Sequence, residues 1–124
     1  MNGAIDDIFI VEEPEYSPGK VRAIIGINKN SAIFEGHFPG RPVVPGACMV
    51  QLVKDVLCGA LDANIILKKA ASIKFINMIT PDINPMPQLI VTYKLIDNVD
   101  ISVNANITIG DVACFKLQAT YTKL

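Results

Sequence analysis

The feature that most limits how this chain can fold is one long apolar segment near its middle, from Pro45 to about Asp62. A proline at the first position, followed by helix-compatible residues, predicts an α-helix. This helix is apolar nearly all round, whereas a surface helix carries a single apolar stripe. Its polar residues form one narrow line: Gln51, Lys54, Asp55 and Asp62. That line is either the solvated edge of the helix or, at Gln51, a group directed into a cleft.

Several other segments are predicted to be β-strands that can surround the helix, and the clearest of them alternate between apolar and polar residues. They are Asp7 to Glu12, Lys20 to Ile27, Ala70 to Ile79, Gln88 to Ile96, Ile101 to Ile109 and Ala113 to the end of the chain. Turns are expected at Pro14 to Gly19 and at Asp97-Asn98, and Gly110-Asp111 suits a type II′ hairpin. Asn28 to Glu35 is irregular, with room for a helical turn. An antiparallel sheet curled around the helix buries both, which predicts one α+β domain over residues 1–124.

Composition excludes several classes of function. The formal net charge of −1 and the lack of a basic run argue against nucleic-acid binding. No apolar run reaches the roughly 18 residues of a membrane span. Asp6 and Asp7 near the start do not fit a secretory signal, so we expect a cytoplasmic protein. The scattered Cys48, Cys58 and Cys114 lack metal-ligand spacing and predict free thiols in a reducing compartment, with no metal site.

A second feature is the loop that leads into the helix, Phe34 to Gly46, which contains the single histidine, His37. Three prolines and three glycines in this loop fix its backbone path. A neutral imidazole is the commonest general base near neutral pH. Gly46 would present a backbone N–H at the positive end of the helix, where it can hold a carbonyl oxygen that gains negative charge during a reaction. The alternative is a structural histidine hydrogen-bonded in a surface loop.

The loop resembles the signature of the 3-hydroxyacyl-(acyl-carrier-protein) dehydratases, enzymes of fatty-acid synthesis. Their motif reads His-Phe-Pro-Gly-x-Pro-x-Met-Pro-Gly, and this chain has His37-Phe38-Pro39-Gly40-Arg41-Pro42-Val43-Val44-Pro45-Gly46. Val44 replaces the methionine. Chain length and element order fit as well, so the resemblance covers nearly the whole chain. It implies the hotdog fold, in which an antiparallel sheet curls around one central helix, and a dimer with joined sheet edges and active sites at its interface.

The resemblance also implies roles for individual residues. The substrate is a thioester on the phosphopantetheine arm of acyl carrier protein, and no cofactor takes part. His37 would remove the α-proton while the Gly46 N–H polarises the thioester carbonyl. Candidates for the wall of an acyl tunnel, each of which is more often plain core, are Phe38, Met49, Phe75, Ile76 and Met78. Because carrier proteins are acidic, basic residues would dock them, and the candidates are Arg41, Lys68, Lys69 and Lys74.

One position departs from the family in a way that matters for the chemistry. The family's acidic residue lies fourteen residues after the histidine, where this chain has Gln51. Glutamine donates and accepts hydrogen bonds but cannot exchange a proton as a carboxyl group does. Asp55, one helical turn on, and Glu35, beside the histidine, are candidates for a substitute acid.

Three hypotheses follow from this half-complete site. The protein is a dehydratase that converts 3-hydroxyacyl thioesters of acyl carrier protein into 2-enoyl products in fatty-acid or related lipid or polyketide synthesis. Alternatively, it is half of a heterodimeric dehydratase, giving His37 while another hotdog subunit gives the acid. The third is a catalytically weakened subunit that binds acyl thioesters or their carrier. A hotdog thioesterase is a weaker fourth. The sequence favours dehydratase-type chemistry in a homodimer, a heterodimer or a higher oligomer.

Overall fold

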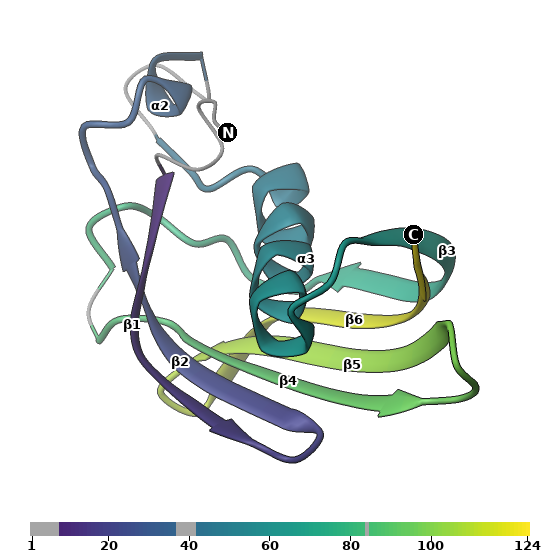
Figure 1. Ribbon diagram of the computed structural model, residues 1–124. Helices are drawn as coiled ribbons and strands as arrows, with labels where there is room; N and C mark the ends of the chain where they lie inside the picture. The colour runs from purple at the N-terminus through teal and green to yellow at the C-terminus, as the bar shows by residue number, and fades with distance from the viewer. Residues whose placement is uncertain (1–7, 37–41, 84) are drawn as a thin grey trace.

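The computed structural model describes residues 8–36, 42–83 and 85–124. Its elements are β1 (Phe9–Ser17), β2 (Lys20–Ile27), α2 (Ile33–Gly36), α3 (Gly46–Leu61), β3 (Ile65–Phe75), β4 (Gln88–Leu95), β5 (Asp100–Ile109) and β6 (Val112–Lys123). The strands form one antiparallel sheet in the order β1-β2-β4-β5-β6-β3. The sheet curls so that α3 lies against its inner face (Figure 1). This is the α+β hotdog architecture that the sequence predicts.

The central helix has nearly the predicted bounds. Pro45 precedes it with an extended backbone (φ −64°, ψ 143°), and Asp62 ends it in the left-handed region (φ 49°). Its buried residues are Cys48, Met49, Leu52, Val53, Val56 and Leu57. Within the described ranges no helix is both long and apolar enough to cross a membrane.

The inner face of the sheet supplies the other half of the core. On β5 the residues Ile101, Val103, Ala105 and Ile107 are all buried, as their strict alternation predicts. Residues directly opposite one another on neighbouring antiparallel strands share a face of the sheet. The register therefore assigns the remaining residues of β2, β4, β6 and β3 to an inner or an outer set.

The last strand departs from the predicted alternation at Cys114. Ile107 pairs with Phe115 and Thr108 pairs with Ala113, so Cys114 is the extra residue of a β-bulge. Both Cys114 and Phe115 are buried as a result, whereas an unbroken alternation from Ala113 onward would put Cys114 on the polar face with Lys116 and Gln118. The turn before this strand agrees with the prediction, because Gly110 has the positive φ (59°) that a type II′ turn needs at its first central position.

The prediction for β3 was wrong at both ends. The strand runs over Ile65–Phe75 instead of Ala70 to Ile79. The bulge explains its early end, because the N–H groups of Ile76 and Asn77 both donate to the Cys114 carbonyl. The Asn77 side-chain amide donates to the carbonyl of Ala113 (2.8 Å). These bonds turn the chain away from the regular ladder.

The first strand is longer than predicted. β1 continues to Ser17, through part of the segment from Pro14 to Gly19 that was expected to be a turn. Its register with β2 shifts between Glu12 and Glu15, and Glu13 has a positive φ of 47°. A bulge at Pro14 is compatible with an edge strand, where the missing proline N–H breaks no ladder on the open side.

Candidate functional site

The start of α3 is held in place from two directions. Just before it, the Val44 N–H donates to the Ile79 carbonyl (2.8 Å), which ties the entering chain to the segment after β3. At the first helical position, a Cβ added to Gly46 would lie 2.7 Å from two carbons of the Phe75 ring. Only glycine fits beneath this ring without displacing it. In the part of the chain that the structure describes, the Gly46 N–H has no acceptor, as is normal for the first turn of a helix.

The histidine of the predicted site belongs to residues 37–41, which lie outside the described residues. The predictions for His37, Phe38 and Arg41 therefore stay predictions. Glu35, one of the two candidate acids, lies in the short helix α2 and is exposed.

Gln51, at the position of the family's acid, makes a specific contact on α3. Its amide nitrogen Nε2 donates to Oδ1 of Asp55 over 2.8 Å. A carboxylate only accepts hydrogen bonds, so the amide must turn its nitrogen to Asp55 and its oxygen Oε1 away. Gln51 is half-buried and Asp55 is exposed. The second N–H and Oε1 of Gln51 can still bind a hydroxyl group, but the amide cannot supply a proton to it.

The candidate wall residues fall into two environments. Met49 is only 4% exposed and belongs to the core. Phe75, Ile76 and Met78 are 55%, 46% and 78% exposed and follow one another along the chain beside the start of α3. The Phe75 ring rests on the buried Phe115, with ring centroids 5.4 Å apart. An apolar surface next to Gly46 is therefore present.

A hollow of about 870 Å³ opens beside this surface. It is lined by Lys29, Pro42, Val43, Met78, Thr80, Pro81 and Asp82. Of the predicted wall residues that the structure describes, it includes Met78 alone. The sequence did not indicate the contribution of Thr80, Pro81 and Asp82, because a loop after a strand carries no pattern that shows where it folds back.

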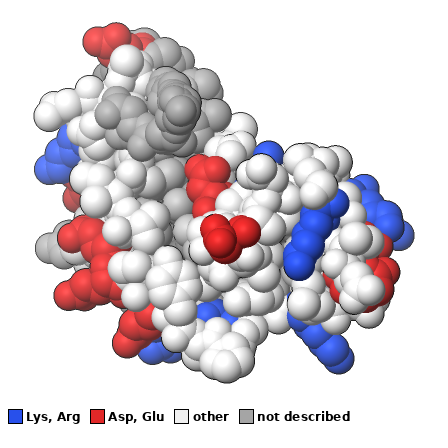
Figure 2. All heavy atoms as spheres, viewed as in Figure 1, with Lys and Arg blue, Asp and Glu red and all other residues white. Residues whose placement is uncertain are grey.

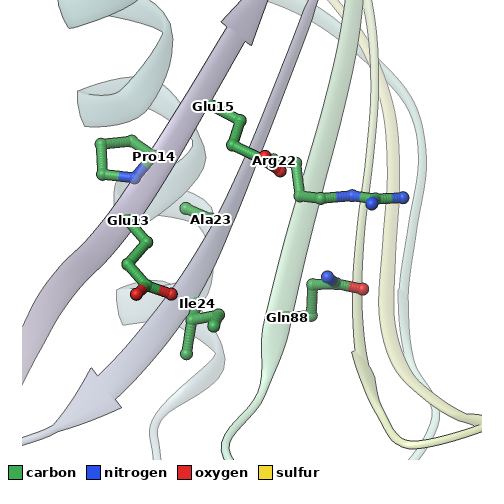
Figure 3. A pocket seen from close by; sticks show the side chains of 7 residues that line it. All are labelled: Glu13, Pro14, Glu15, Arg22, Ala23, Ile24 and Gln88. Atoms are coloured by element: carbon green, nitrogen blue, oxygen red, sulfur yellow. The ribbon is translucent and has the colours of Figure 1, made fainter.

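A second hollow, of about 540 Å³, lies at the bulge of β1 (Figure 3). It is lined by Glu13, Pro14, Glu15, Arg22, Ala23, Ile24 and Gln88. None of the predicted site residues within the described ranges contributes to it. We favour the hollow beside Pro42 and Val43, because it adjoins the motif loop and the helix start.

The predicted docking lysines separate into different roles. Lys68 forms an ion pair with Asp100, with Nζ 2.6 Å from Oδ2. The hydrogen bond from Lys68, followed by one from Thr122, holds the pKa of Asp100 below its usual value. Lys69 and Lys74 are exposed and carry no ion pair among the described residues. Figure 2 shows acidic side chains gathered over the β1 side of the molecule and basic ones over the β3 side.

The cysteines agree with the prediction of free thiols. Cys48 and Cys114 are buried, and burial raises the pKa of both thiols, which makes them poor nucleophiles. Among the described residues no group of His, Cys, Asp and Glu side chains has the arrangement of a metal site.

Comparison with known sequences points to one family. The model of the ApeI-like family, described as ApeI dehydratase, matches residues 13–104. The 3-hydroxyacyl-(acyl-carrier-protein) dehydratase FabZ of Caldicellulosiruptor saccharolyticus is 36% identical over 52 residues, which cover 42% of this chain and 34% of that protein. FabZ of Acetivibrio thermocellus is 38% identical over 47 residues, which cover 37% of this chain and 32% of that protein. The match spans about a third of the length of these relatives.

Solved structures show the same fold at low identity. The dehydratase heterocomplex ApeI:P of Xenorhabdus doucetiae superimposes with a TM-score of 0.70 at 15% identity, covering 92% of this chain and 97% of the other. An uncharacterised protein of Erwinia carotovora superimposes with a TM-score of 0.69 at 17% identity, covering 94% of this chain and 96% of the other. A hypothetical thioesterase of Streptococcus pneumoniae, solved with coenzyme A, superimposes with a TM-score of 0.68 at 11% identity, covering 95% of this chain and 87% of the other.

Proposed function

This chain belongs to the ApeI-like dehydratase family, and we propose that it acts on 3-hydroxyacyl thioesters of an acyl carrier protein. Water is removed across the Cα–Cβ bond to give a 2-enoyl thioester, in fatty-acid or related lipid or polyketide synthesis. The names of the FabZ relatives support this substrate class. The observation that carries the proposal is the helix start, where Gly46 leaves an N–H for an oxygen beside an exposed apolar surface.

The proposed reaction uses the loop and the helix start together. His37 takes the α-proton, and the Gly46 N–H stabilises the negative charge that develops on the thioester oxygen. The electron pair of the broken C–H bond then forms the double bond as the β-hydroxyl leaves. That hydroxyl needs a proton to depart as water.

The source of this last proton decides between two forms of the protein. One N–H of Gln51 is bound to Asp55, and the amide, whichever of its other groups meets a substrate hydroxyl, has no acidic proton to give it. In a homodimer the proton returns from the imidazolium of His37 or comes from a substitute acid, Asp55 or Glu35. In a heterodimer a carboxylic acid on the helix of a second hotdog subunit supplies it. The lack of a carboxyl group at Gln51 supports a heterodimer as the second candidate, and the ApeI:P heterocomplex is a precedent in the same fold.

Dimer formation through β3 is part of the proposal. This strand ends the sheet, and its exposed apolar residues include Ile66, Leu67, Ile73 and Phe75. An exposed edge strand has unpaired N–H and C=O groups that can pair with a strand of another chain. Joining two β3 edges would extend the sheet and cover these side chains.

Purified protein, alone and co-expressed with a hotdog subunit that carries the helix carboxylate, tests the proposal. Each preparation is incubated with 3-hydroxyacyl carrier substrates of several chain lengths, and mass spectrometry follows the loss of one water. His37→Ala is the matched inactive control. Activity of the lone chain supports the homodimer, and activity that requires the second subunit supports the heterodimer. If neither preparation dehydrates any substrate, or if His37→Ala keeps full activity, the proposed function is wrong.

A further inference from the structure

The outer face of the sheet, which α3 leaves uncovered, has a regular arrangement of charges that its register defines. Across one row, Lys74 of β3 pairs with Lys116 of β6, and this pairs with Asn106 of β5. The row continues through Ile90 to Arg22 of β2. Two neighbouring rows are Ser72, Gln118, Asn104, Thr92 and Lys20, and Lys69, Thr120, Ser102 and Lys94.

The cations of these rows form two lines. Lys69, Lys74 and Lys116 lie on β3 and β6, whereas Lys20, Arg22 and Lys94 lie on β2 and β4. Between the lines runs a neutral band of amides and hydroxyls: Ser102, Asn104, Asn106, Gln118 and Thr120. Strands lie about 4.8 Å apart, so the two lines are about 10 Å apart between β4 and β6 and about 19 Å apart between β2 and β3. An α-helix, about 10–12 Å wide with its side chains, can lie over the neutral band with side chains that reach both lines.

On strands β2 to β6 acidic residues are nearly absent from this face, whereas β1 at its edge carries Glu12, Glu13 and Glu15. The strands β2, β3, β4 and β6 contain none, and the single acid of β5, Asp100, is paired with Lys68. Glu15 lies opposite Arg22, but in Figure 3 the Arg22 guanidinium extends away from it, on the same side as the Gln88 amide. Among the described residues no ion pair neutralises the six cations.

The pairing of Lys74 with Lys116 is unfavourable for the fold, since like charges directly opposite on neighbouring strands repel. These lysines line a hollow of about 350 Å³ together with Ser72, Asn104, Asn106 and Gln118, which offer further N–H and O–H donors. No side chain that lines the hollow is a carboxylate. The hollow is therefore suited to receive an anionic group from outside.

We propose that this outer face docks an acidic surface helix of a folded partner protein, and that the partner is the carrier that delivers the thioester. This inference rests on the proposed function for the identity of the partner. The helix would lie along the neutral band with carboxylates directed to both lines of cations, and one of them would enter the hollow beside Lys74 and Lys116. Of the lysines expected from the sequence, Lys69 and Lys74 belong to this surface, whereas Lys68 is already paired with Asp100.

Other occupants fit the face less well. A second copy of the chain would place six cations against six cations. Single-stranded nucleic acid needs aromatic platforms, and none of the residues in the three rows is aromatic. A bilayer is flat, whereas this face is the outside of a curled sheet and would touch it along its centre alone (Figure 1).

The test is a binding titration with acyl carrier protein that lacks its phosphopantetheine arm, so that no catalysis is involved. Lys74→Glu/Lys116→Glu should weaken the carrier's Kd about tenfold or more, and Lys20→Glu/Lys94→Glu should do the same from the other line. Lys54→Glu/Lys123→Glu is the matched control, since it changes the net charge equally at residues that the register does not place in the outer-face rows. Its Kd should stay within about twofold of wild type. The wild-type Kd should also rise with salt.

A catalytic measurement separates docking from chemistry. For each variant the ratio of kcat/KM on carrier-linked to pantetheine-linked 3-hydroxyacyl substrate is compared, and it should fall for the outer-face variants alone. If no substrate is dehydrated, the proposed function fails while the titration still decides the docking. Equal weakening by the control variant, unchanged Kd in both outer-face variants, or binding of phosphatidylglycerol vesicles in place of the carrier would overturn the inference.

Discussion

Replacing Gln51 by glutamate tests the contact that defines the helix side of the site. The substitution keeps the shape of the side chain but exchanges the N–H donor for a second carboxylate facing Asp55. In the wild-type protein these atoms are 2.8 Å apart. Gln51→Glu therefore removes a hydrogen bond and introduces a repulsion at the same place.

The size of the effect follows from the position of the pair on α3. The two residues are four apart on a helix, where a Gln–Asp hydrogen bond stabilises by about 0.2–0.5 kcal/mol and like charges destabilise by a similar amount. Since Asp55 is exposed, water screens the repulsion. The sum is about 0.5–1 kcal/mol at neutral pH, which lowers Tm by about 2–4 °C for a domain of this size.

The loss should depend on pH in a definite direction. The neighbouring carboxylate raises the pKa of the introduced carboxylic acid in the folded state above its unfolded value of about 4.3. The folded protein then binds more protons than the unfolded chain, so its stability falls as pH rises through this range. Urea unfolding of wild type and Gln51→Glu from about pH 3.5 to 8 should show curves that meet at the acid end and separate above about pH 5.

Gln51→Glu/Asp55→Asn is the matched control, because it reverses the direction of the hydrogen bond and restores a donor. It should recover wild-type stability at pH 7. A Gln51→Glu variant that is as stable as wild type at pH 7, or a double variant that recovers nothing, would refute the assignment of the Gln51 amide nitrogen as the donor to Asp55.

Three further predictions concern single contacts. Gly46→Ala should fold, because Phe75 is half exposed and can move aside, but its dehydration rate should fall about 10²-fold as the methyl group blocks the N–H. Tyr121→Phe should raise the free energy of unfolding in urea by about 1 kcal/mol, since the buried Tyr121 hydroxyl has no partner among the described residues. Lys68→Met should raise the pKa of Asp100, measured by NMR. In the wild-type protein the lowered pKa of Asp100 stabilises the fold above the usual carboxyl pKa, and this stability is lost as the pH falls through the lowered pKa. Lys68→Met should remove that contribution.

The parts of the fold that were predictable are those that local sequence determines. The helix from Gly46 to Leu61 was found because its proline start and apolar pattern act within a few turns. The hairpin at Gly110 was found because a positive φ selects glycine. The end of β3 was missed because it depends on the Cys114 bulge in a strand far along the chain.

In the candidate site and on the outer face too, local features could be predicted from the sequence and features that depend on strand register could not. Gln51 and Asp55 could be placed on one line of the helix from their spacing, and their hydrogen bond follows from it. Lys116 was not predicted to lie with Lys74, because their proximity depends on the register between β3 and β6. A one-residue slip would have sent either side chain to the opposite face, so charge patterns on a sheet need the register as well as the sequence.

A heterodimer would have one active site instead of two, and this gives the sharpest test of the proposed pairing. The resemblance to the dehydratase family implies that each site combines the loop of one subunit with the helix of the other. A chain with the His37 loop and Gln51 can complete a site with the partner's acid, but its own helix faces the partner's loop without one. Gln51→Glu in this chain, with the partner unchanged, should activate that second site and raise kcat per heterodimer by up to about twofold. Gln51→Asn is the control that changes the side chain without adding a carboxyl group. An unchanged kcat in Gln51→Glu, measured on saturating carrier-linked substrate with the heterodimer intact by mass, would refute the division of roles.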